Sequence, residues 1–291
     1  MVRQGFQEVW DVARSEDEKR LTRILRDSER FFNYEIHIDR ESLVALQDEA
    51  EDFVMSHGNI ARLILARLAC LAKDEESMRR HHYAILENSP DDPAIFRDYS
   101  ESLRKMGYYS EAREMARRAH ELAPADGELL RMLVKDCMVS GFFQASWHYL
   151  DLAIRANARV TAREYDFLSQ SVLFLREKNI ADPELERLQQ IAIAVLRLEE
   201  LLPMGVFRSP AVHMEFLYNQ PVASGGKESK KQVFLMWGIQ TSVRGDHLGI
   251  LNARLYQAIS RSQLGQHILS HIKIRFFHRT REGMMSSGFN Y

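Results

Sequence analysis

Histidines near the end of one predicted helix have the residue type and spacing of a metal site. His267 and His271 are four positions apart, so that both imidazoles could reach one ligand. His247 and His278 are candidate further ligands. The glutamate that would follow the first histidine in a zinc-protease motif is missing. We therefore interpret them as ordinary histidines at a helix end, and expect no metal site and no cofactor.

Two other short motifs lose their functional meaning when their neighbours are considered. Gly225–Lys227 suggests a phosphate loop, but Pro221 stands at the position of the first required glycine and Glu228 at that of the Ser/Thr. Arg244–Asp246 spells an adhesion tripeptide, which a glycine turn followed by a helix-capping Asp246 explains better. We expect a flexible basic loop at the first motif and a helix start at the second.

Cys70 and Cys137 stand among apolar residues of predicted helices, where we expect them to be buried small hydrophobes. Two cysteines cannot form a disulfide framework, which favours a reducing compartment. The first residues carry no apolar leader, and no apolar run is long enough for a membrane span. The chain also lacks a GxSxG nucleophile elbow. These features predict a cytoplasmic protein and give no support to an enzyme.

The net charge of −2 hides two parts of opposite sign. Residues 1–204 carry −9 and residues 205–291 carry +7, counting Lys, Arg, Asp and Glu. A division of this size predicts two parts with different surfaces.

Landmark residues recur every 34 positions in the first two thirds of the chain. Pro90 and Pro124 have this spacing, and so do Gly107 and Gly141. The unit between the prolines carries a large–small–aromatic pattern on its first helix, with Phe96, Tyr99, Ser100 and Leu103, and small residues on its second, with Ala112, Ala116 and Ala119. Methyl-sized side chains let paired helices approach closely, and glycine permits the tight turn between them.

This pattern resembles the tetratricopeptide repeat over about residues 59–160, extending more weakly to residue 202. The resemblance implies an α-solenoid of antiparallel helix pairs that binds a peptide or protein segment in a groove lined by the first helix of each pair. In this frame six charged residues line the groove: Arg67, Arg97, Glu101, Arg104, Arg131 and Lys135. The apolar Met132 and Met138 should face it too. The arginines and the lysine would suit an acidic partner.

The flanks complete a mainly α architecture. Residues 1–58 should form N-terminal capping helices and residues 59–204 the repeat domain, in which Asp182 caps a last helix and Pro203 ends the helical region. Residues 205–291 change to strand periodicity and predict a small basic α+β domain in the order strand–strand–helix–strand. Its helix should run from Asp246 to about Ser270, and its first two strands should be joined by a lysine-rich loop.

The basic C-terminal part offers a second candidate surface. Its positive side chains are Lys227, Lys230, Lys231, Lys273, Arg275 and Arg279. Phe276 and Phe277 stand among them, as aromatic residues do on surfaces that bind single-stranded nucleic acid. Docking on the acidic helices, on another protein, or on nucleic acid all remain open.

Three function classes follow. The first is a non-enzymatic adaptor or scaffold whose repeats bind a protein and whose C-terminal domain anchors or regulates. The second is a nucleic-acid-associated factor that binds through the basic domain. The third is an enzyme with its site in that domain.

Overall fold

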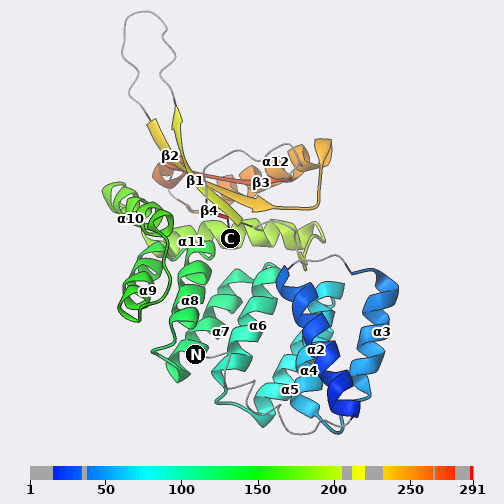
Figure 1. The fold of residues 1–291 in the computed structure, drawn as a ribbon. Coiled ribbons are helices and arrows are strands. Elements are labelled where there is room, and N and C mark those ends of the chain that lie inside the picture. Colours follow the sequence, from blue (N-terminus) through cyan, green and yellow to red (C-terminus); the bar gives the residue numbers. More distant parts are fainter. Residues whose placement is uncertain are drawn as a thin grey trace, which may run out of the picture. The chain divides into compact units, whose positions relative to one another are not determined.

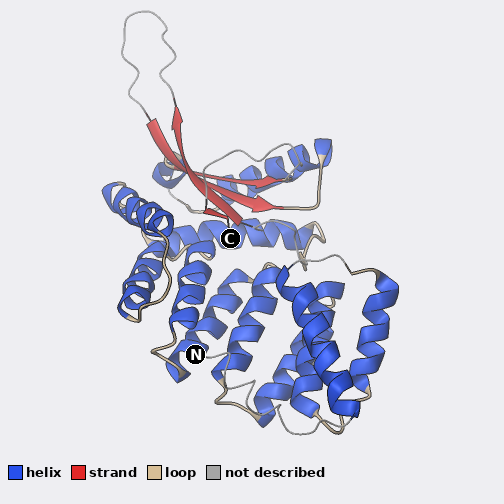
Figure 2. Cartoon of the chain, viewed as in Figure 1, coloured by secondary structure: helices blue, strands red, loops and turns tan. Residues whose placement is uncertain are grey.

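The structure, a computed structural model, describes residues 16–34, 38–204, 212–219, 232–264, 266–278 and 289–290. This part of the chain is mainly helical, with a series of helices followed by a small mixed sheet (Figure 1, Figure 2). The first helices are α2 (Glu16–Tyr34), α3 (Arg40–Glu51), α4 (Gly58–Ala72), α5 (Glu75–Asn88), α6 (Pro93–Lys105), α7 (Tyr109–Leu122), α8 (Gly127–Val139), α9 (Phe143–Arg155), α10 (Ala162–Glu177) and α11 (Asp182–Leu198). The C-terminal elements are β1 (Val212–Asn219), β2 (Gln232–Gln240), α12 (Gly245–Arg261), α13 (Gln266–Leu269), β3 (Ile272–Phe277) and β4 (Phe289–Asn290). None of the described helices has both the length and the apolar character that a membrane span requires.

Backbone contacts divide the chain into two compact units, Met1–Ile95 and Phe96–Tyr291. In the first unit, helices α2, α3 and α4 share a core that contains Leu21, Ile24, Leu43 and Ile64. Both cysteines, one in each unit, are free and buried, as expected. The domain boundaries expected after residues 58 and 204 stay predictions.

The 34-residue period appears directly in the helix boundaries. The second helix of each hairpin, α5, α7 and α9, begins at residues 75, 109 and 143. The turn before each contains a residue with positive φ, namely Lys73 at 63°, Gly107 at 90° and Gly141 at 93°. The predicted series of antiparallel helix pairs followed by a small α+β part is therefore confirmed.

Small side chains pack where the repeat pattern placed them. Ala112, Ala116 and Ala119 are fully buried on α7. Ala116 and Ala119 contact a cluster that includes Leu129 and Leu133 of α8. Because a methyl group fills each of these positions, α7 and α8 can approach closely.

Helix α11 and the segment that follows it lie against the two glycine turns of the second unit. A Cβ built on Gly141 would be 2.6 Å from the backbone nitrogen of Glu186, near the start of α11. A Cβ on Gly107 would be 2.6 Å from Sδ of Met204, just beyond the end of α11. Within this unit, Figure 1 shows α11 between the ends of the repeat helices and the sheet. The glycines thus serve two purposes, since they permit the turn and leave room for α11 at Gly141 and for the segment after α11 at Gly107.

Asp182 has a different role from the predicted one. It is the first residue of α11, and Ala181 is the cap position. Its carboxylate instead accepts hydrogen bonds from the backbone N–H groups of Gln144, at 3.1 Å, and Ala145, at 3.3 Å. These are among the free N–H groups of the first turn of α9. Asp182 therefore caps a neighbouring helix.

The sheet has the order β3-β2-β1-β4, with β2 antiparallel to β1 and parallel to β3. Its inward face is apolar and includes Met214, Trp237 and Ile274, which are paired across the three long strands. These side chains belong to the same core as residues of α8, α9, α10 and α11. The predicted strand–strand–helix–strand order is confirmed, and the short strand β4 adds to it.

The C-terminal helix is shorter than predicted. α12 ends at Arg261, and the cap residue Ser262 is extended with ψ at 157°. A separate turn of helix, α13, follows. At the start of α12, Arg244 is the cap and Asp246 lies inside the first turn, where its charge favours the helix dipole. The Asn252 side chain of α12 bonds both backbone groups of Phe276 in the edge strand β3, at 3.0 and 2.8 Å.

The link from α11 toward the sheet is packed. Leu201 and Leu202 are partly buried against the core of the second unit, and Met204 is buried. The Met204 N–H donates to the Met106 carbonyl at 3.0 Å. Val206 and Phe207, which we also expect to be buried, lie outside the described residues.

Candidate binding face on helices α6 and α8

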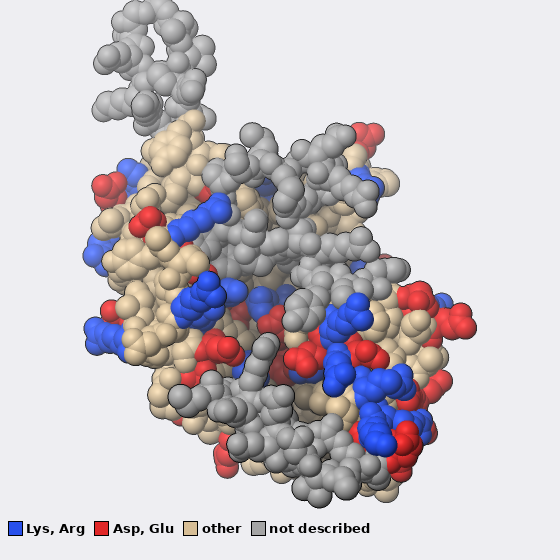
Figure 3. Space-filling view, viewed as in Figure 1, with Lys and Arg blue, Asp and Glu red and all other residues tan. Residues whose placement is uncertain are grey.

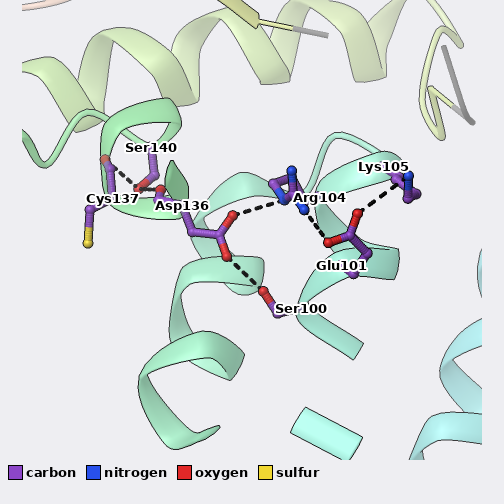
Figure 4. Close-up of polar contacts among 7 residues, drawn as sticks. All are labelled: Ser100, Glu101, Arg104, Lys105, Asp136, Cys137 and Ser140. Atoms are coloured by element: carbon purple, nitrogen blue, oxygen red, sulfur yellow. Dashed lines mark hydrogen bonds and ion pairs between the residues drawn. The ribbon is translucent and has the colours of Figure 1, made fainter. Parts of the chain in front are cut away.

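Five of the charged residues expected to line a groove lie on α6 and α8. We call this surface the α6–α8 face, and it consists of Arg97, Glu101, Arg104, Arg131 and Lys135. The two helices that carry it are neighbours, because side chains from α6 contact Asp136 of α8 directly. Figure 4 shows Ser100 and Arg104 pointing toward Asp136.

Asp136 is fully buried and was not among the residues expected to be functional. Its Oδ2 accepts a hydrogen bond from Ser100 at 2.8 Å, and its Oδ1 lies 3.0 Å from Nε of Arg104. The sequence carried a signal for it, since Asp136 follows Leu129 and Leu133 by seven and three positions and so stands on the apolar side of α8. Ser100 occupies the small position of the repeat pattern, which brings its hydroxyl close to α8.

Arg104 joins two carboxylates. Besides Asp136, its Nη2 pairs with Glu101, one turn earlier on α6. Glu101 also lies 3.4 Å from Nζ of Lys105. Only a fifth of the Arg104 side chain is exposed, at 20%. These ion pairs and the hydrogen bond from Ser100 hold α6 beside α8. They also engage the guanidinium group of Arg104.

The charges of this network shift each other's pKa values. Burial alone would raise the pKa of Glu101, but Arg104 and Lys105 outweigh it and lower that pKa to about 2. Burial raises the pKa of Asp136 to about 6, against the opposing effects of Arg104 and Ser100. Burial, together with the nearby Arg104 and Arg131, lowers the pKa of Lys135.

Arg97 and Arg131 are more open than Arg104. Each side chain is 36% exposed. Arg97 faces Glu128, and Arg131 faces Glu164 of α10, with the closest nitrogen and oxygen 3.8 Å apart in both pairs. These distances exceed those of hydrogen bonds. The two guanidinium groups thus keep donors for a ligand.

The remaining expected groove residues lie differently. Arg67, in the first unit, has its guanidinium over the ring of Phe32, 5.8 Å from the centroid. Met132 and Met138 are buried, 8% and 0% exposed, so the expectation that they face a groove is wrong. Both methionines are used in helix packing.

Only part of the second candidate surface falls within the described residues. Lys273 donates to the Leu269 carbonyl at 2.9 Å, and its ammonium is 4.9 Å from the ring centroid of Phe234. Arg275 is exposed. Lys227, Lys230, Lys231 and Arg279 lie outside the described residues, so the basic surface stays a prediction.

The histidines considered for a metal site have separate surroundings. Nε2 of His267 lies 3.7 Å from Glu184, whereas the ring of His271 packs edge-on against Phe174. Nδ1 of His278 lies 3.1 Å from the Thr241 carbonyl. Within the described ranges, no group of three or more His, Cys, Asp or Glu side chains is arranged to hold a metal ion.

Charges of both signs are interspersed over the side of the molecule shown in Figure 3. The α6–α8 face follows the same principle, because each arginine on it has a carboxylate nearby. Such a face can recognise a partner by the arrangement of its charges. Each charged group of the partner must lie opposite a group of the other sign on the face.

No protein-family model and no curated protein matches this chain. Among solved structures it is similar to a mutant of MamA, with a TM-score of 0.36 and 12% identity. The match covers 52% of this chain and 83% of the other.

Proposed function

We propose that the protein is a non-enzymatic adaptor or scaffold that holds a segment of a partner protein on the α6–α8 face. One observation carries this proposal. Arg97 and Arg131 are 34 residues apart, in consecutive repeats, and both guanidinium groups remain partly exposed with their nearest carboxylate 3.8 Å away. The apolar side chains Leu129, Leu133 and Met132 of α8 are buried, so on this helix the charged positions are the ones available to a partner.

The C-terminal sheet has a supporting role in this proposal. It shares its core with α8, α9, α10 and α11, and α11 in turn packs on the glycine turn at Gly141. A sheet attached in this way can anchor or regulate the repeats. Nucleic-acid binding by the basic residues of this part is the competing proposal.

Affinity capture from source cells tests the adaptor function. We expect the wild-type chain to retain a protein partner, and the double variant Arg97→Glu, Arg131→Glu to lose it while keeping its melting temperature. Arg118→Glu is the matched control, because Arg118 is 56% exposed on α7 and lies outside the face. Capture that survives the double substitution contradicts the proposal. Retention of nucleic acid alone, with no protein, favours the competing function.

A further inference from the structure

The arginines of the α6–α8 face differ in how far they are already occupied. Arg104 is committed to Glu101 and Asp136. Arg97 and Arg131 stand at the same position of consecutive repeats, and within the described part of the chain each has a single ion pair and no hydrogen bond. An arginine offers five N–H donors in a planar fork that matches a carboxylate.

The carboxylates beside these two arginines do not hold them strongly. Glu128 is 78% exposed, and an exposed pair contributes little to stability. Oε2 of Glu164 already accepts hydrogen bonds from the N–H and the hydroxyl of Thr161, the N-cap residue of α10, both at 2.8 Å. A ligand carboxylate can therefore bind either arginine without breaking a strong internal contact.

The distance between the two arginines determines how far apart two carboxylates of a ligand must be. They lie on neighbouring helices, whose axes are typically about 8–10 Å apart. An extended chain in the polyproline II conformation has three residues per turn and advances about 3.1 Å per residue, so side chains three residues apart lie on the same side and about 9 Å apart. The buried contacts of Asp136 with Ser100 and Arg104 hold α6 and α8 at a fixed separation.

We infer that the α6–α8 face binds an extended acidic segment in which carboxylates recur every third residue, one on Arg97 and the next on Arg131. This inference rests on the proposed function and specifies the partner for the same face. The sequence spacing of the acids, rather than their total charge, would determine affinity.

Two peptides of identical composition test the inference on the full chain. One has the sequence Glu-Gly-Ser repeated four times, and the other has four consecutive Glu followed by the same glycines and serines. We expect the spaced peptide to bind about tenfold more tightly in a fluorescence anisotropy titration. Arg97→Gln or Arg131→Gln should remove this preference, whereas Arg118→Gln should retain it.

Equal affinities for the two peptides, no binding of the spaced peptide, or a preference that persists in both glutamine variants would overturn the inference. The capture experiment separates this failure from failure of the adaptor function. If the double glutamate variant loses a cellular partner but the peptides bind equally, the face binds proteins and the spacing rule is wrong.

Discussion

Asp136 is fully buried, and its ionised form depends on the arginine beside it. Burial raises its pKa to about 6 even with Arg104 in place. Loss of the arginine should therefore destabilise the fold, because a buried carboxylate without a cation is unfavourable. The same network holds α6 against α8, so a change at this residue also affects the binding face.

Arg104→Met should lower the free energy of unfolding by about 3–5 kcal/mol at pH 7.5. Without the cation, the folded pKa of Asp136 rises further above its unfolded value. The folded state then binds the extra proton, and stability falls as pH rises through that range. Urea unfolding at pH 7.5 and pH 5 should show a smaller loss at the lower pH. Arg118→Met, on an exposed pair, should change little, and an equal loss for Arg104→Met at both pH values would contradict the prediction.

His81 of α5 makes the first unit sensitive to acid. It is 7% exposed, and burial together with Arg80 and Arg62 lowers its pKa to about 4. The unfolded chain keeps the ordinary value of 6.5 and binds the proton first as the pH falls. The stability contributed by neutral His81 is therefore present above pH 6.5 and is lost toward pH 4.

Between pH 7 and pH 5 this group should reduce the free energy of unfolding by about 2 kcal/mol. We expect His81→Gln to remove that part of the pH dependence, as measured by denaturant midpoints of the full chain. His247→Gln, at an exposed position of α12, is the control and should retain the wild-type dependence. A wild-type slope in the His81 variant would show that another group is responsible.

At the scale of elements, α11 connects parts that the repeat pattern alone does not join. Its start packs on the turn at Gly141, and the segment beyond its end packs on the turn at Gly107. Asp182 adds a cap for α9. Helix α11 thus fixes the hairpins relative to each other within the second unit.

Gly141→Ala should therefore destabilise the protein by about 2–4 kcal/mol, because both a positive φ and a backbone clash oppose the new methyl group. Gly249→Ala is the matched control. Nothing lies within 4 Å of its added Cβ, and it stands inside α12, so it should stabilise by about 0.5–1 kcal/mol. Melting temperatures measure both effects, and similar values for the two variants would refute the close approach of α11.

At the scale of the whole molecule, the contacts define two compact units. The sheet belongs to the second one, because Trp237 and Ile274 share a core with Leu188 and Leu196 of α11. Strands and helices with a common core should open together.

Native-state hydrogen exchange tests this cooperativity. In increasing denaturant, the slowest amides of β2 and of α11 should converge to one opening free energy. Exchange of β2 at a clearly lower free energy, with α11 still protected, would show that the sheet unfolds by itself.

The sequence by itself determined the helix hairpins and their period, because turn glycines, buried alanines and apolar spacing are local signals that repeat every 34 residues. It also determined the strand–strand–helix–strand order of the last third. These features depend on residues close together in the chain.

Only the tertiary structure decided which charged residues are open. Arg97 and Arg104 stand on α6 and Arg131 on α8, yet buried Asp136 pairs with Arg104, whereas Arg97 and Arg131 are partly exposed. It also decided that Asp182 caps α9, 38 positions away, and that Met132 is buried. Such contacts leave no periodic trace in the sequence, because packing and charge pairing act through space between neighbouring helices.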